Sequence, residues 1–409
     1  MNIIIILLII ITAAAGYFIK KASKRIATVD DEVFELSTLS RSLYIISAIL
    51  LTALVCTFVA GKLTWESHLI EWLTLLIRWA HVVLGIAWIG ASFYFIFLEN
   101  SLNRTENLRD ELAGNLWAIH GGGFYYLEKY KSAPKKLPKT LHWFKYEAYF
   151  TWLTGFVLLT LVYYMNAKAY MTDPAVSDIT SDEAIYIGLA SLISGWLIYD
   201  ILCRTSLLQK KKLFAVIGFT ILTGISFILS RYLSGRAAFM HVGALLGTIM
   251  VGNVFFVIIP AQKAMVAAAK KGVAVNPELG KYAGLRSLHN NYMTLPVIFV
   301  MISNHFPLTF GHAFNWIILA LLTLGSVAVR HYINLHEKGI YAKWMLPFAA
   351  VALLALVIIT APENKNKKLP PVNFSEVQPI FQKRCISCHS SHPTDDTQKI
   401  APNGIMFDT

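Results

Sequence analysis

The chain has 409 residues, is 56% hydrophobic, and carries 36 Lys and Arg against 24 Asp and Glu. So much apolar sequence places most of the chain in lipid and excludes an ordinary water-soluble enzyme. The positive charges lie in short loops between apolar runs and form no single stripe, so they indicate membrane topology and exclude nucleic acid as a partner. The sequence therefore predicts an all-α, polytopic transmembrane bundle.

About ten apolar runs are each close to the roughly 20 residues that a helix needs to cross a bilayer. The first is expected to be a retained anchor and not a signal peptide, because its basic residues follow the apolar run. Two runs fall in an N-terminal extension, residues 1–70, and eight in a main membrane domain, residues 71–361. The expected spans are 1–19, 43–60, 72–98, 147–166, 184–203, 213–230, 238–260, 292–309, 313–329 and 345–361.

The loops between these runs differ in charge. Most basic residues, including Arg286 and Arg330, fall on one side, which the positive-inside rule makes the cytoplasm. The loops on that side are 20–41, 99–146, 204–212, 261–291 and 330–344. The opposite loop 167–183 is acidic, and the tail after residue 361 emerges there. We therefore expect a multi-pass protein of a bacterial inner membrane with its C-terminal segment in the periplasm.

Polar side chains recur within two of the runs. In 72–98, His81 and Trp88 lie on one helix face, and polar groups at membrane depth point inward. His81 is a candidate ligand for haem or metal, a candidate proton relay, or a histidine hydrogen-bonded between helices. In 238–260, His241 shares a face with small residues, which permit close approach of a neighbouring helix or of a flat ring.

The most polar stretch brackets the run 292–309. Its polar residues are His289, Asn290, Asn291, Asn304 and His305. Amides present donors and acceptors in one plane, which suits a planar heterocycle, and histidine moves protons at physiological pH. The alternative is that these residues cap a short, broken helix at the membrane interface.

The loop 99–146 contains His120 followed by three glycines. Glycines let the backbone approach a ligand closely, so this segment is a candidate entrance or lid. The lysines that follow it are explained by the positive-inside rule alone.

Near the C-terminus stand Cys385, Cys388 and His389 in the spacing Cys-x-x-Cys-His. This spacing attaches haem c through two thioethers, and the histidine supplies the proximal iron ligand. A zinc knuckle is the alternative, but it needs further ligands, and only His392 follows. The motif therefore predicts a covalent haem c, with iron bound by His389.

The segment that carries this motif, residues 373–409, follows a linker at 362–372. We interpret it as the start of a cytochrome c domain. It is too small to bury a haem alone, so we expect either that the segment is truncated or that the haem rests on another surface. Its one methionine, Met406, is too close to the motif in the sequence to be the expected distal iron ligand, so we assign no distal ligand.

Four segments resemble those of the membrane-bound urate oxidases, also called urate hydroxylases, which join a multi-helix domain to a C-terminal cytochrome c. They are RWAHVVLGIAWIGASFYF, LWAIHGGGFYYLEKY, HVGALLGTIMVGNVFFVIIPAQ and RSLHNNYMTLPVIFVMISNHFP, in the same order, and the similarity runs from about Trp72 to the end. The resemblance implies oxidation of urate to 5-hydroxyisourate in purine catabolism. Electrons would pass to haem c and on to a terminal oxidase or another cytochrome, so that no peroxide forms.

With urate as the implied substrate, the polar residues receive hypothetical roles. The catalytic candidates are the inward histidines His81, His241, His289 and His305. The substrate-binding candidates are Asn290, Asn291, Asn304, Trp88 and His120. His81, His241 and His305 are also candidates to hold an internal haem b or metal. Two other functions stay open: oxidation of another small reductant such as a different purine or a quinol, and a non-catalytic electron-transfer or transport subunit.

Overall fold

The computed structural model describes residues 13, 16–17, 42–48, 63–134, 136–361, 372–394, 401 and 404–408. The chain divides into two compact units, one formed by Met1–Leu73 with Lys368–Thr409 and the other by Thr74–Lys367. The predicted span 1–19 lies outside the described residues except at three positions, and the predicted linker lies outside them except at Val372. The predicted domain limits stay predictions.

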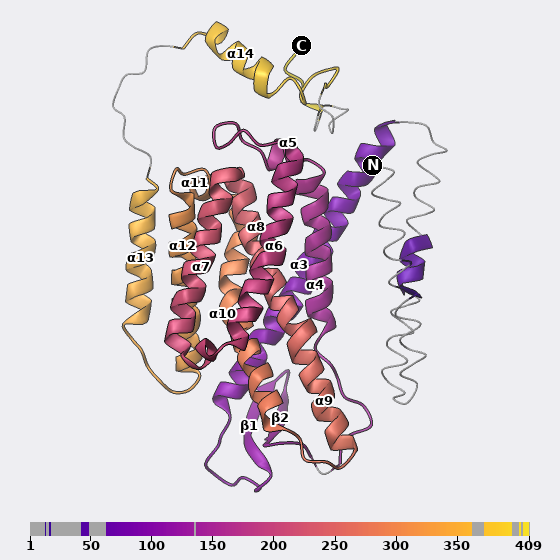
Figure 1. Ribbon diagram of the computed structural model, residues 1–409, viewed down its shortest axis with the longest axis vertical. Helices are drawn as coiled ribbons and strands as arrows, with labels where there is room; N and C mark the ends of the chain where they lie inside the picture. The colour runs from indigo at the N-terminus through magenta and orange to yellow at the C-terminus, as the bar shows by residue number, and fades with distance from the viewer. Residues whose placement is uncertain are drawn as a thin grey trace. The chain divides into compact units, whose positions relative to one another are not determined.

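The larger unit is a bundle of helices that run side by side (Figure 1). Its first element is the part of α3 (Leu63–Ser101) that begins at Thr74. The next elements are α4 (Tyr146–Leu158), η1 (Leu159–Tyr164), α5 (Ala167–Tyr170), α6 (Ser181–Arg204), η2 (Ser206–Gln209) and α7 (Lys211–Tyr232). The remaining elements are α8 (Gly235–Gly252), η3 (Asn253–Ile258), α9 (Ile259–Lys270), α10 (Pro277–Ser303), α11 (Pro307–Phe310), α12 (Asn315–His336) and α13 (Met345–Ile359).

Five helical runs among the described residues are long and apolar enough to cross a membrane. They are His68–Ser101, Ser181–Arg204, Lys211–Tyr232, Gly235–Lys270 and Asn315–His336. This confirms the prediction of a mainly helical chain and is consistent with a membrane protein, whereas the count of ten spans stays a prediction.

The all-α prediction is wrong between residues 112 and 130, where a β-hairpin forms. Strands β1 (Leu112–His120) and β2 (Gly123–Tyr130) pair antiparallel. Gly121 and Gly122 join them, both at positive φ (57° and 81°), which a two-residue type I′ turn requires. The glycines after His120 therefore make a tight hairpin turn, where we had expected a loop.

Two of the predicted cytoplasmic loops are also wrong in extent, because helices continue into them. Residues 261–291 are mostly helical: α9 reaches Lys270 and α10 begins at Pro277. The loop expected at 330–344 begins only after α12 ends at His336. As a result, Arg286 and Arg330 are helical residues inside the bundle.

Local sequence sets where α6 and α10 begin. The hydroxyl of Thr180 accepts a hydrogen bond from the backbone of Glu183, whose carboxylate accepts one from the backbone of Thr180. This reciprocal capping box starts α6. Asn276 caps α10 through Glu278 N (3.0 Å), and Pro277 occupies the first turn, where its missing N–H costs nothing.

Helix α8 forms the centre of the bundle and packs against α6, α7 and α10. Most of its residues are buried, among them Phe239, Val242 and Leu245. Glycines permit the close approach of its neighbours: a Cβ on Gly252 would lie 2.6 Å from the ring of Trp196 in α6. Helix packing is thus the observed role of this small-residue stripe.

The run from α8 to α9 is interrupted by the π-helical turn η3. Pro260 follows it closely, and a proline in a helix removes one N–H and clashes with the carbonyl four residues before. A wider π turn accommodates such a break and reorients the side chains on it. The first residue of η3 is Asn253, which is fully buried.

The smaller unit contains α14 (Phe374–Arg384), followed by a turn through Cys385–Cys388. Phe381 and His389 both contact the ring of Phe407, with centroids 5.2 Å and 5.4 Å away.

We predict that Gly252→Ala lowers the stability of the bundle by about 1–3 kcal/mol, because the added methyl group overpacks against Trp196. Thermal unfolding in detergent, followed by intrinsic fluorescence, measures this. Gly218→Ala in α7 is the matched control, since no atom lies within 4 Å of its Cβ position. It should leave stability unchanged or raise it by up to about 1 kcal/mol. Equal losses in both variants would contradict the packing account.

Candidate functional site

Two arginines are buried inside the bundle. Arg286 of α10 is 0% exposed and Arg330 of α12 is 2% exposed. The prediction that both lie in cytoplasmic loops is therefore wrong. A buried guanidinium requires partners, because an unpaired charge away from water is very costly.

Arg286 is held by groups from three helical elements. Its Nη2 donates to Asp200 Oδ1 (2.7 Å) on α6 and to the hydroxyl of Tyr282 (2.5 Å). Its Nη1 donates to Asn253 Oδ1 (3.0 Å) on η3. Asp200 also accepts from Arg204 Nε (2.7 Å), so one carboxylate serves two guanidinium groups. The local charge is therefore positive.

Asn253 connects this ion pair to neighbouring polar groups. Its Nδ2 donates to Tyr199 OH (3.0 Å) and to Asn290 Oδ1 (2.8 Å). Asn290 in turn donates to the backbone carbonyl of Met250 (2.9 Å). The structure thus places the predicted residue Asn290 in a buried network, where its amide orients its neighbours.

His289 lies at the edge of the same network. Its Nδ1 and the hydroxyl of Tyr199 share a hydrogen bond of 2.9 Å, and its ring stacks on Phe214, with centroids 5.0 Å apart and planes 21° apart. In the tautomer that donates Nδ1–H to Tyr199, Nε2 is an acceptor, and it has no hydrogen bond within the described part of the chain. The side chain of His289 is half-buried.

We name this group the α10 polar core. Its members are Tyr199, Asp200, Asn253, Arg286, His289 and Asn290. Of these, the sequence predicted His289 and Asn290 as site residues and missed the others. A signal was present, since Arg286, His289 and Asn290 have the spacing of one helix face, but that face was assigned to a loop.

Asn291 faces a second buried cluster, on α12. Its Oδ1 accepts from Arg330 Nε (2.8 Å) and from Asn334 Nδ2 (3.1 Å). Arg330 also lies over the ring of Phe93 (4.2 Å) and 3.7 Å from Glu337. Asn100 donates to the Glu337 carboxylate at 2.8 Å. We name this second group the α12 polar cluster, and its members are Asn100, Asn291, Arg330, Asn334 and Glu337. Neighbouring asparagines of α10 thus serve separate networks on opposite sides.

His81 and His241 each contact a glycine on a neighbouring helix. His81 donates from Nδ1 to Thr151 O (3.0 Å) on α4, and a Cβ on Gly155 would lie 2.9 Å from its ring. His241 is 0% exposed, donates to Ala237 O (2.8 Å), and packs against Gly188. The bond from His81 to α4 fits a histidine hydrogen-bonded between helices. His241 Nδ1 donates within its own helix, and its Nε2 lies 3.3 Å from the hydroxyl of Tyr164 in η1. The predicted catalytic roles of both histidines stay predictions.

Asn304 and His305 stand at the opposite end of α10 from the polar core. Asn304 accepts a hydrogen bond from the hydroxyl of Tyr163 (2.9 Å), a residue of η1. His305 is exposed, so the prediction that it points inward is wrong: α10 ends at Ser303, which leaves His305 in the turn before α11. Its predicted membership of one site with His81 and His241 stays a prediction.

Trp88 and His120 lie outside both polar groups. Trp88 packs, partly buried, against Ala148, Val254 and Ile259. His120 is exposed beside the hairpin turn. Their predicted substrate contacts stay predictions.

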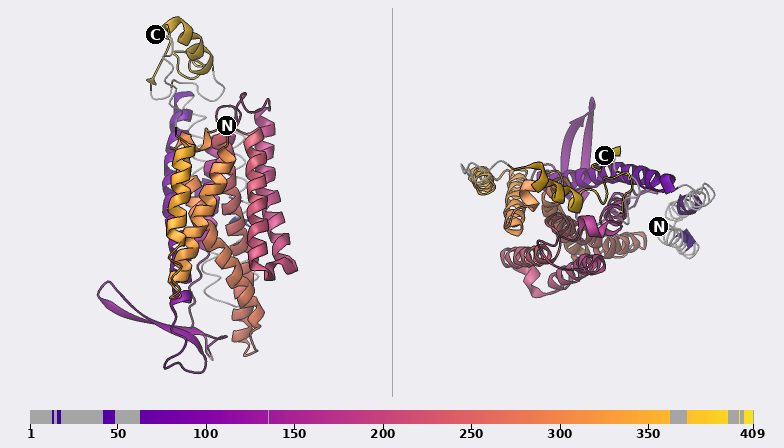
Figure 2. Two further views of the ribbon diagram at one scale, coloured as in Figure 1. Left: turned by 90° about the vertical axis from the view of Figure 1, so that its left-hand side faces the viewer. Right: turned by 90° about the horizontal axis from the view of Figure 1, so that it is seen from above.

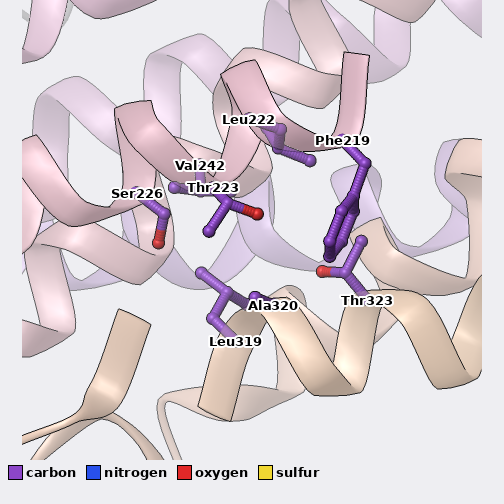
Figure 3. Close-up of a pocket in the computed structure, with 8 residues that line it drawn as sticks. All are labelled: Phe219, Leu222, Thr223, Ser226, Val242, Leu319, Ala320 and Thr323. Atoms are coloured by element: carbon purple, nitrogen blue, oxygen red, sulfur yellow. The ribbon is translucent and has the colours of Figure 1, made fainter. Parts of the chain in front are cut away.

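No group of three or more His, Cys, Asp or Glu residues among those described has the arrangement of a metal site. A small cavity lies between α7, α8 and α12 (Figure 3). The volume that the centre of a water molecule can occupy there is about 10 Å³, which is enough for one water. Its walls include the hydroxyls of Thr223 and Ser226, and neither has a hydrogen-bond partner in the part of the chain that the structure describes. The cavity suits a structural water and is too small for a substrate.

The residues of the Cys-x-x-Cys-His motif fit a haem. Cys385 and Cys388 lie on one turn, and neither forms a disulfide. His389 donates from Nδ1 to Ile405 O (3.0 Å), which leaves Nε2 for iron. Metal-binding histidines ordinarily donate such a hydrogen bond from the ring nitrogen that does not bind the metal. Nearby, hydrogen bonds from Ser391 hold the pKa of Asp408 below its ordinary value and close the loop.

We predict that Arg286→Met destabilises the bundle by about 3–5 kcal/mol, because it leaves Asp200 without its buried partner. The double variant Asp200→Leu/Arg286→Met should lose less than the sum of the single losses. Lys281→Gln is the control: its ion pair with Glu278 is exposed, so the change should be under about 1 kcal/mol. Detergent-phase unfolding measures all of these, and a loss no larger for Arg286→Met than for the control would refute the role of the ion pair.

Residues 67–361 match the model of a family described as Urate oxidase N-terminal. The match covers the α10 polar core and the α12 polar cluster, and it ends before the Cys-x-x-Cys-His motif. It confirms the predicted relationship to urate oxidases. No curated protein and no solved structure matches the chain.

Proposed function

The chain belongs to the urate oxidase N-terminal family, and on that premise we propose that it oxidises urate to 5-hydroxyisourate at the α10 polar core. The observation that carries this proposal is that the matched region contains a connected network of histidine, tyrosine, amides and a buried ion pair. Polar groups of this kind inside a membrane bundle mark functional sites.

The chemistry sets what such a site must supply. Urate and water give 5-hydroxyisourate, two electrons and two protons, as the hydroxyl from water adds to C5. The site therefore needs a proton acceptor, partners for the amide-like edges of a planar purine, and an electron acceptor.

His289 is the proposed proton acceptor. Tyr199 holds its Nδ1 and Phe214 holds the plane of its ring, so that Nε2 is presented in a fixed direction. Arg286 and Asp200 act as positioning residues, because they fix Tyr199 and Asn253 behind the histidine. The positive local charge of the core favours the urate anion.

Cys385, Cys388 and His389 are the proposed holders of haem c. When attached, this haem would supply a one-electron acceptor that connects the reaction to a terminal oxidase or another cytochrome.

The basic residues at one end of the bundle support an orientation of the bundle in the membrane. The end that carries the hairpin also carries Lys210, Lys211, Lys270 and Lys271 (Figure 1). We propose that this end faces the cytoplasm of a bacterial inner membrane. Helix α13 then ends on the periplasmic side, where haem c is attached.

We predict that His289→Ala lowers the rate of urate oxidation by about 10²–10⁴, the range for loss of a general base. Purified variants are assayed anaerobically with urate and an artificial electron acceptor, and 5-hydroxyisourate is measured as it forms. His305→Ala is the control, since His305 is exposed away from the core, and it should keep its activity. Wild-type protein that oxidises xanthine or a quinol but not urate would overturn the proposed substrate.

We predict that Cys385→Ser/Cys388→Ser abolishes covalent haem, as measured by haem staining of denaturing gels and by the pyridine haemochrome spectrum. The variant should still oxidise urate with the artificial acceptor, because the polar core lies in the other unit. Covalent haem that persists in this double variant would refute the haem assignment.

A further inference from the structure

The hairpin β1–β2 extends sideways from the bundle. Seen from above, it reaches beyond the surrounding helices, and seen from the side its tip rises to the level of the lower end of α13 (Figure 2). A segment placed in this way lies near the boundary between lipid and water when the helices cross a membrane.

The base of the hairpin is fixed to the end of α3. Asn103 and Asn115 exchange backbone hydrogen bonds of 2.8 Å and 3.0 Å. Arg104 Nη1 donates to Ala113 O (2.9 Å), and Lys129 of β2 forms an ion pair with Glu99. The sideways direction is therefore set by specific contacts.

The outer part of the hairpin exposes large apolar side chains on one face. Trp117 pairs with Tyr126 and Ile119 with Phe124 in the strand register. Directly paired residues of antiparallel strands share a face, so these four lie together. Trp117 is 67%, Ile119 68% and Phe124 79% exposed. A two-stranded sheet with such a face is at best marginally stable in water, and it requires a cover.

Positive charge follows the hairpin along the chain. Lys136 and Lys139 are exposed and form no ion pair within the described residues. Aromatic side chains beside lysines are typical of the interface between a membrane and water, where rings sit at headgroup level and ammonium groups bind lipid phosphates.

We propose that the hairpin is an interfacial anchor that inserts the face formed by Trp117, Ile119, Phe124 and Tyr126 into the leaflet at the basic end of the bundle, with Lys136 and Lys139 on anionic lipid phosphates. The hairpin is continuous with α3, whose exposed Trp79 and Ile86 provide an apolar surface suited to lipid. The positive charge favours an anionic lipid over a second copy of this basic chain.

Site-specific photo-crosslinking tests this. Full-length protein with p-benzoylphenylalanine in place of Phe124 is placed in nanodiscs of one part phosphatidylglycerol to three parts phosphatidylcholine and irradiated. Intact-mass spectrometry then identifies the adducts. We expect lipid adducts, with phosphatidylglycerol above its one-quarter share. Val273 is the control position. It is exposed in the loop after α9, and that helix carries it about 20 Å away from Pro260, which lies at the start of α9. The probe at Val273 should therefore yield no lipid adduct.

A second position and a charge variant complete the test. The same probe at Ile119 should also give lipid adducts, which guards against a local effect at Phe124. Lys136→Gln/Lys139→Gln should lower the phosphatidylglycerol share of the adducts to one quarter. Adducts with a second copy of the chain, or no lipid adduct at either hairpin position, would overturn the proposal. Lipid adducts without enrichment of phosphatidylglycerol would overturn its anionic specificity.

Discussion

The buried ion pair between Asp200 and Arg286 is the constraint on which the interior of the bundle depends. Neither charge is tolerable in a lipid-immersed core without the other, because desolvation of an unpaired charge outweighs any local packing gain. The pair joins α6 to α10, and Asn253 extends it to η3. The π turn at η3 places that amide, so an irregular piece of helix coincides with the most polar part of the interior.

The same constraint connects structure to chemistry. The groups that neutralise the Arg286 guanidinium also fix Tyr199 and, through it, His289. A histidine held in this way, with one ring nitrogen available as an acceptor, is suited to proton transfer. The α12 polar cluster repeats the principle on the other side of α10, with Arg330 held by Asn291. Among the described residues, three buried atoms of this cluster have no hydrogen-bond partner: Arg330 Nη2, Asn291 Nδ2 and Asn334 Oδ1. In the α10 polar core, the Nε atom of Arg286 is the one such atom in the described part of the chain.

The sequence predicted the helical bundle because apolar runs of bilayer length are a strong, local signal. It predicted polar roles for His289 and Asn290 because histidines and asparagines bracket a single apolar run. It failed where the answer depends on tertiary contacts. Arg286 and Arg330 were assigned to loops because charge near an apolar run ordinarily marks its end. Their buried partners Asp200 and Asn291 are 86 and 39 residues away in the chain. The hairpin was missed although Gly121-Gly122 between aromatic-rich strands is a known turn signal.

The central claim is that urate binds against the α10 polar core. Electron cryo-microscopy of the full-length protein in nanodiscs, prepared without oxygen or an electron acceptor and with saturating urate, tests it most directly. The account predicts density for a planar ligand within hydrogen-bond distance of His289 Nε2, with Asp200 and Arg286 still paired. Urate density elsewhere in the bundle, with the surroundings of His289 unchanged, would contradict it.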